Sequence, residues 1–247
     1  MLPAQPNQSL IDGLTCLQAV VSAAAPQGTR ELGRRLGLEP TRVSRLIKTL
    51  AHLEMVKQGD DRKYQAGPAI HVLSAQALFA SSLLRRALGP LAKLQQGSLI
   101  VALGVLWRDQ VAYLFHALPG MTAAAALGRV GLYPASRSGI GLPLLACRSD
   151  GEVRRAYAGQ GVPGFGDGGA GMKALLRELA LVRKQGYALV EQDRERQVWS
   201  LGVTLGTPEY AALAFSGRIK RRQLPALLGD LRAAARAIEL PAATELV

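Results

Sequence analysis

The chain has 247 residues, of which 49% are hydrophobic and 19% charged, with a formal net charge of +12 at pH 7. This length predicts two domains, and the apolar content excludes a largely disordered chain. The positive charge favours encounters with a polyanion such as nucleic acid but confers no sequence preference.

The charge is not confined to one region. Residues 1–88 carry 11 basic and 6 acidic residues, and residues 89–247 carry 19 and 12. Cys16 and Cys147 are the only cysteines, and two distant thiols without a recognisable export signal predict reduced residues. No uncharged apolar stretch of about 18 residues is present. We therefore expect a cytoplasmic protein with no membrane partner.

Three short helices are predicted at the N-terminus. The first begins with a capping box at Ser9 and ends before Pro26. The second runs from Thr29, expected as its N-cap, to Gly37, and the third begins at Pro40 or the next residue.

The third predicted helix has two chemically different sides. One is an apolar stripe that fits a core face, formed by Val43, Leu46, Ile47, Leu50 and Leu53. The other carries residue types that bond phosphates and purine edges. The alternative is the solvated charged face of an ordinary surface helix.

A short hairpin is predicted after the third helix, with a turn over residues 58–62. Helix, turn, helix and hairpin in this order are the layout of a winged helix-turn-helix. Basic residues of the hairpin would add salt-dependent affinity for the DNA backbone. The predicted DNA contacts are Thr29, Thr41, Arg42, Ser44, Arg45, Lys48, Arg62 and Lys63.

The run Thr29-Arg-Glu-Leu-Gly-Arg-Arg-Leu-Gly-Leu38 and the hairpin ending Lys63-Tyr-Gln-Ala-Gly-Pro68 resemble the bacterial IclR family of transcription regulators. The resemblance extends over about residues 9–240. It implies an α+β chain with a winged helix-turn-helix DNA-binding domain (1–68), a linker and dimerisation helix (69–88) and an effector-binding domain (89–247). The alternative for the linker is a helix packed within its own subunit.

The effector-binding domain implied by the resemblance has a six-stranded antiparallel sheet, similar to GAF and PAS sensor domains. Residues 98–115 are predicted to form its first hairpin, with a turn at Arg108-Asp109. The other matching segments are a loop and helix over 134–146, a helix end at 184–187, the last strand over 212–217 and the final helix over 220–238.

Three departures from the family pattern predict an effector different from those of its best-known members. Ser136-Arg-Ser138 stands where the family often has a His-Ala-Thr-like run, and Ser200 stands where members often have a cysteine. Residues 190–193 replace part of an acidic stretch.

By resemblance, the effector pocket is lined by Leu103, Trp107, Gly139, Ile140, Glu191, Ser200 and Ser216. The expected helix start after Ser138 also suggests an anion site of backbone N–H groups, with Arg137 clamping a carboxylate. A small organic acid is therefore one candidate effector. The alternatives are core positions for Leu103 and Ile140, and plain surface positions for Trp107, Glu191 and Arg137.

Catalytic, metal and cofactor motifs have little support. Residues 164–169 match G-x-G-x-x-G literally, but no strand precedes them. No nucleophile elbow or metal-ligand spacing is present. We predict no cofactor and no enzymatic activity. The alternatives are an enzyme or carrier domain whose winged helix contacts proteins, and a regulator with a closed pocket.

The predicted partners are a pseudo-palindromic double-stranded DNA operator, a small-molecule effector and further copies of the chain, as a dimer or a dimer of dimers.

Overall fold

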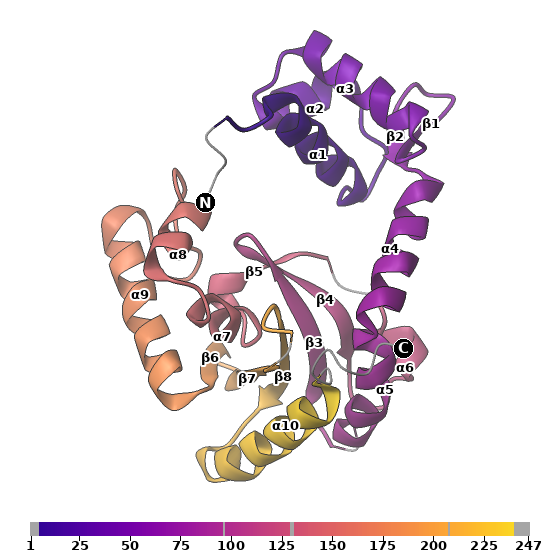
Figure 1. Cartoon of the computed structure of the whole chain (residues 1–247). Coiled ribbons are helices and arrows are strands. Elements are labelled where there is room, and N and C mark those ends of the chain that lie inside the picture. The colour runs from indigo at the N-terminus through magenta and orange to yellow at the C-terminus, as the bar shows by residue number, and fades with distance from the viewer. Residues whose placement is uncertain (1–4, 96, 129–130, 207, 240–247) are drawn as a thin grey trace. The chain divides into compact units, whose positions relative to one another are not determined.

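The computed structural model describes residues 5–95, 97–128, 131–206 and 208–239. The chain forms two compact units, Met1–Ser82 and Leu83–Val247, and Figure 1 shows the elements of each. The fold is α+β, as predicted.

The N-terminal unit has three helices, a hairpin and a fourth helix. A single apolar core, which includes Val20, Leu32, Val43 and Ile47, joins the first three helices to the hairpin. The elements are α1 (Gln8–Val21), α2 (Thr29–Leu36), α3 (Pro40–His52), β1 (Val56–Gln58), β2 (Tyr64–Ala66) and α4 (Pro68–Ser81).

The starts of the first two helices differ from the prediction. Asn7, not Ser9, caps α1, and its side chain accepts a hydrogen bond from the Leu10 N–H. Gly28 is the N-cap of α2, so Thr29 is the first helical residue. At α1 a polar residue two positions earlier does the capping, whereas at α2 the N-cap is a glycine with no capping side chain. Helix ends are for this reason harder to predict than helices.

The apolar stripe of α3 is narrower than predicted. Val43, Ile47 and Leu50 are buried, but Leu53 is 54% exposed and Leu46 is half-buried. Leu53 follows the end of α3 as its C-cap, beyond the residues that pack against this core.

The hairpin is hydrogen-bonded to the loop between α1 and α2. β1 and β2 pair antiparallel with Val56 opposite Ala66. Gln27 exchanges both backbone hydrogen bonds with Tyr64, at 2.8 and 2.9 Å. This bridge fixes the base of the hairpin against the helices.

The linker segment is two helices, not the single helix predicted over residues 69–88. α4 ends at Ser81, its C-cap Ser82 has a left-handed φ of 51°, and α5 (Leu83–Leu94) follows. A left-handed residue breaks the run of α-helical hydrogen bonds. No residue of α4 is buried, and Phe79 is 78% exposed.

The second unit is built on the six-stranded antiparallel sheet that the resemblance implied, with strand order β5-β4-β3-β8-β7-β6. The strands are β3 (Ile100–Trp107), β4 (Gln110–Ala117), β5 (Tyr133–Pro134), β6 (Ala188–Asp193), β7 (Val198–Thr204) and β8 (Ala211–Arg218).

Helices cover both faces of this sheet (Figure 1). α5 and α10 pack on one face, and α7 and α9 on the other. The remaining helical elements are α6 (Ala123–Ala126), η1 (Ala135–Arg137), α7 (Gly141–Ala146), α8 (Asp150–Ala156), α9 (Gly168–Gln185), η2 (Arg221–Gln223) and α10 (Leu224–Ile238).

The two faces make two separate cores. On β3, Val101 and Leu103 belong to the core with α5 and α10, whereas Ala102 and Leu106 belong to the core with α7 and α9. Alternate residues of a strand point to opposite faces, so a single strand serves both cores. Among the described residues, no helix is long and apolar enough to cross a membrane.

Candidate functional site

The side of α3 opposite its buried stripe presents polar side chains to solvent. Thr41, Arg45 and Lys48 are exposed and Ser44 is half-buried. Hydroxyl, guanidinium and ammonium groups on one helix face suit contact with phosphates and base edges.

Arg42 differs from its neighbours on α3 because it is already bound within the chain. Its Nη2 lies 2.6 Å from Oδ2 of Asp12 on α1, whose side chain is only 8% exposed. Asp12 Oδ1 also accepts a hydrogen bond of 2.7 Å from Gln8. Asp12 thus holds α3 against α1 through Arg42 and takes no part in a capping box with Ser9.

The hairpin places its basic residues near a tight turn. Arg62 has a left-handed φ of 58°, and its N–H donates to the Gly59 carbonyl. The Asp61 side chain accepts from the Lys63 N–H. Arg62 and Lys63 are exposed, as is Lys57.

A second candidate site is a cavity of about 260 Å³ on the α7 side of the sheet. It brings together four of the predicted effector residues: Ser138, Gly139, Ser200 and Ser216. The sequence did not single out the rest of the lining, which is Ile100, Ala102, Tyr113, His116, Tyr133, Gln192 and Ala214.

Tyr113 and Ser138 are the centre of the polar lining. Their hydroxyl oxygens lie 3.2 Å apart, and Ser138 Oγ also accepts from the Ile140 N–H at 3.1 Å. The rings of Tyr113 and His116 meet edge to face with centroids 5.4 Å apart. Burial raises the pKa of Tyr113, and the hydrogen bond between the Tyr113 and Ser138 hydroxyls opposes this increase only in part. Tyr113 therefore stays a neutral phenol near pH 7.

Gln192 connects the cavity to the loop before α7. Its amide accepts a hydrogen bond from the Tyr133 hydroxyl at 3.3 Å and donates one to the Arg137 carbonyl at 2.8 Å. Together with Ser138, this bond fixes the segment that forms one wall of the cavity.

Glycine is required where this wall meets β7. A Cβ on Gly139 would overlap the Ser200 side chain, and one on Gly202 would overlap the Gly139 carbonyl. The loop therefore lies directly on the strand, which positions Ser200 at the cavity.

Three of the predicted effector residues lie elsewhere. Leu103 is fully buried on the opposite face of the sheet, and Ile140 is core between α7 and the sheet. Trp107 is 39% exposed at the end of β3, with the Arg108 guanidinium 5.0 Å from its ring centroid. Leu103 and Ile140 thus take the core positions that were the alternative interpretation.

Arg137 and Glu191 are also outside this cavity. Both line a different surface depression, and Glu191 forms an ion pair with Arg194 at 3.6 Å. Around the start of α7, the N–H groups of Ile140 and Leu142 bond to Ser138, so they are not available to the anion site expected there, which stays a prediction.

Among the residues that the structure describes, no Asp, Glu, Lys or Arg lines the cavity. No group of three or more His, Cys, Asp or Glu residues in the described part of the chain is arranged to hold a metal ion. The lining can donate and accept hydrogen bonds through hydroxyl, imidazole and amide groups. Such a site can bind a small polar molecule.

Comparison with known proteins identifies the chain. The family described as "Bacterial transcriptional regulator IclR C-terminal" matches residues 75–240, which places the chain among bacterial transcriptional regulators. The chain belongs to the IclR family. Members of this family are regulators and not enzymes. No curated protein matches the chain in sequence.

Solved structures share the fold. A putative IclR regulator from Silicibacter sp. TM1040 is 23% identical, with a TM-score of 0.77 over 93% of this chain and 94% of its own. An IclR-family regulator from Brucella abortus is 23% identical, with a TM-score of 0.71 over 95% and 92%. An IclR homologue from Microbacterium hydrocarbonoxydans, complexed with 4-hydroxybenzoate, is 22% identical, with a TM-score of 0.64 over 93% and 97%.

Proposed function

We propose that the chain is a sequence-specific DNA-binding transcriptional regulator that responds to a small molecule. The N-terminal unit is the DNA-binding domain, with α2 and α3 as a helix-turn-helix and the hairpin as its wing. The observation that carries this proposal is the exposed polar face of α3 opposite its buried stripe.

Within this proposal the predicted DNA contacts have different roles. Arg45, Lys48, Thr41 and Ser44 read base edges and phosphates. Arg42 is a positioning residue, since its guanidinium is paired with Asp12. Thr29, Arg62 and Lys63 contact the phosphate backbone.

We further propose that the chain self-associates through α4. This helix has no buried residue and exposes Val72, Leu73 and Phe79, and a helix with so much exposed apolar surface gains stability from a partner. A dimer, or a dimer of dimers, would read a pseudo-palindromic operator. Phe79→Ser should reduce the mass measured by light scattering, and an unchanged mass would exclude this role of α4.

The effector site in this proposal is the cavity at Tyr113, Ser138 and Ser200. Its neutral donors suit a molecule with hydroxyl or carboxylate oxygens, so a small organic acid remains a candidate without a clamp from Arg137. The family relative solved with 4-hydroxybenzoate makes that compound a suitable first probe. It should raise the Tm of the chain, and Ser216→Leu, which fills the cavity, should abolish the shift. A panel of organic acids and polar metabolites without any shift would favour the closed-pocket alternative.

The decisive experiment is fluorescence anisotropy with the DNA flanking the gene of this chain, over a salt series and with a scrambled control. We expect a preference for the native fragment of about 10³-fold or more. Equal and steeply salt-dependent binding to both fragments would show only the attraction of a basic protein for a polyanion and would contradict sequence-specific recognition of this fragment.

A further inference from the structure

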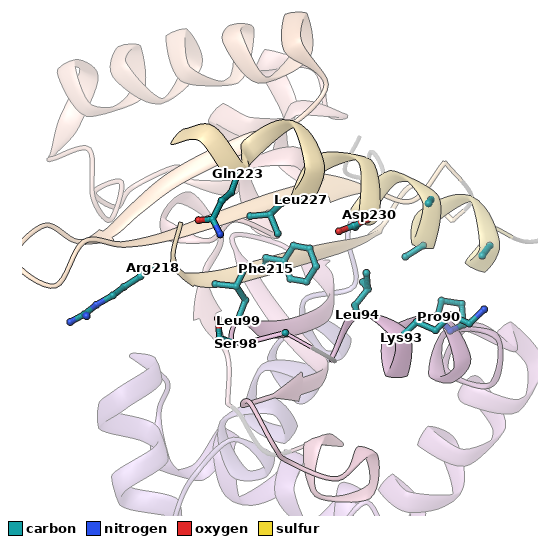
Figure 2. A pocket seen from close by; sticks show the side chains of 14 residues that line it. Pro90, Lys93, Leu94, Ser98, Leu99, Phe215, Arg218, Gln223, Leu227 and Asp230 are labelled. Carbon is teal, nitrogen blue, oxygen red and sulfur yellow. The ribbon is translucent and has the colours of Figure 1, made fainter. Parts of the chain in front are cut away.

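The face of the sheet opposite the effector cavity holds a second and larger cavity (Figure 2). Its volume is about 580 Å³, within the range of about 300–1,000 Å³ typical of small-molecule sites. It lies between α5, α10, residues 97–99 before β3, and β8. Of the described residues that line it, none also lines the effector cavity.

The cavity exists because the face of α10 toward it changes from large to small residues. Gln223, the N-cap of α10, lines its first part with Leu227 and Asp230, and the rest is lined by Ala233, Ala234 and Ala237. These positions recur every three or four residues, which places them on one side of the helix. On α5 the cavity is lined by Pro90, Lys93 and Leu94.

The lining is apolar in the middle and charged at its ends. In Figure 2, Phe215 lies between Leu99 and Leu227, with Arg218 and Gln223 toward one end and Lys93 toward the other. Phe215 is buried, whereas the charged side chains are exposed. Apolar groups can thus hold the body of a ligand, and the cations at the rim can hold an anionic group.

The charged side chains at the rim of the cavity are not paired with one another. Within the described residues, none of Lys93, Arg218 and Asp230 forms an ion pair with another side chain. Two cations against one carboxylate leave an excess of positive charge around an apolar cavity.

We propose that this cavity is a second ligand site, which binds a small organic anion with an apolar body, such as a medium-chain carboxylate. Its apolar part occupies the space between Leu94, Phe215 and the alanines of α10. Its carboxylate pairs with Lys93 or Arg218. The site is separate from the effector cavity and does not depend on DNA binding.

The test uses the full chain, with 8-anilinonaphthalene-1-sulfonate as a fluorescent probe and decanoate as competitor. Ala233→Trp and Ala237→Trp fill the cavity from exposed positions, and each should weaken probe binding at least ten-fold. Ala226→Trp is the matched control, because Ala226 is an exposed alanine of α10 that does not line the cavity. It should stay within two-fold of wild type, and circular dichroism should show all three variants folded.

The charge requirement is tested separately. Combining Lys93→Ala with Arg218→Ala should weaken competition by decanoate several-fold and leave competition by decanol unchanged, with Arg222→Ala as a control outside the cavity. Equal probe affinity of the cavity-filling variants and Ala226→Trp would overturn the site. Equal loss of decanoate and decanol would overturn the assignment of an anionic ligand. Loss of probe binding in Ser216→Leu would place the probe in the effector cavity and contradict the proposal.

Discussion

The carboxylate of Asp12 and the guanidinium of Arg42 form an ion pair of 2.6 Å that joins α1 to α3. Asp12 is nearly buried and Arg42 is 43% exposed by side chain, so solvent screens the pair only from one side. The orientation of the proposed recognition helix therefore depends on a residue in the first helix.

Replacing Asp12 by Asn should loosen this attachment. The substitution keeps the shape but removes the charge that pairs with Arg42, and we expect the free energy of unfolding to fall by about 1–2 kcal/mol. Urea denaturation measures this change. Asp60→Asn at the exposed tip of the hairpin is the control and should change stability by less than about 0.5 kcal/mol. Equal effects of the two substitutions would show that the ion pair contributes nothing.

Arg45→Ala should weaken specific DNA binding without weakening the fold. Arg45 is exposed on the face of α3 opposite the core, and a bidentate contact to a base contributes about 1–3 kcal/mol of discrimination. Anisotropy with the cognate fragment should show a loss of roughly 5- to 150-fold, with an unchanged Tm.

Arg177→Ala, which removes an exposed arginine from α9, is the matched control for charge and should bind DNA like the wild type. If Arg45→Ala stays within two-fold of wild type on both cognate and scrambled DNA, α3 is not the recognition helix.

The two cysteines should differ in reactivity. Cys16 is fully buried, and burial, with a smaller contribution from Asp12, raises the pKa of its thiol. Cys147 is exposed, although partial burial also raises its thiol pKa. Because the thiolate is the reactive form, a disulfide reagent should modify one thiol per native chain and two per denatured chain.

The rate at Cys147 should keep rising with pH beyond the point at which an ordinary thiol is fully ionised, since a raised pKa delays ionisation. Cys147→Ser should abolish the reaction of the native chain. Rapid modification of Cys16 in that variant would contradict the packing of α1 against α3.

The sequence predicted the strands of the second unit well but not the faces of those strands. Both faces are buried, so apolar residues occupy successive positions, and alternation does not show which side carries the cavity. Leu103 was assigned to the effector pocket by resemblance, and the alternation of the strand could not correct that assignment. The pairing register of β3 and β8 shows which residues face the cavity: Ala102 pairs with Ala214, and both residues line it.

Tyr113 and His116 were missed for a related reason. Residues three apart on a strand normally point to opposite faces. The register of β3 and β4 shifts between Leu103 and Gly104. Leu103 pairs with Phe115 and Gly104 pairs with Tyr113, so Leu114 has no partner residue on β3. Such a bulge places Tyr113 and His116 on one side, and nothing in the local sequence indicates it.

The contact between Gly202 and the loop before α7 should tolerate no side chain. An added Cβ would overlap the Gly139 carbonyl, so Gly202→Ala should lower the free energy of unfolding by about 2–3 kcal/mol. An added Cβ at Gly229 on α10 has no atom within 4 Å. Gly229→Ala should therefore stabilise the helix by up to about 1 kcal/mol. The same sign of change for both variants would contradict the close approach of loop and strand.

Tyr113 should make the stability of the chain sensitive to alkaline pH. Burial raises the pKa of this phenol above its ordinary value, so the folded chain binds the proton more tightly than the unfolded chain does. The resulting stability is fully present below the ordinary tyrosine pKa and is lost as the pH rises through the folded-state pKa. Tyr113→Phe keeps the ring against His116 but removes the ionising group. Denaturation across this range should therefore show a shallower loss of stability with pH for Tyr113→Phe than for wild type, and parallel curves would show that Tyr113 titrates normally.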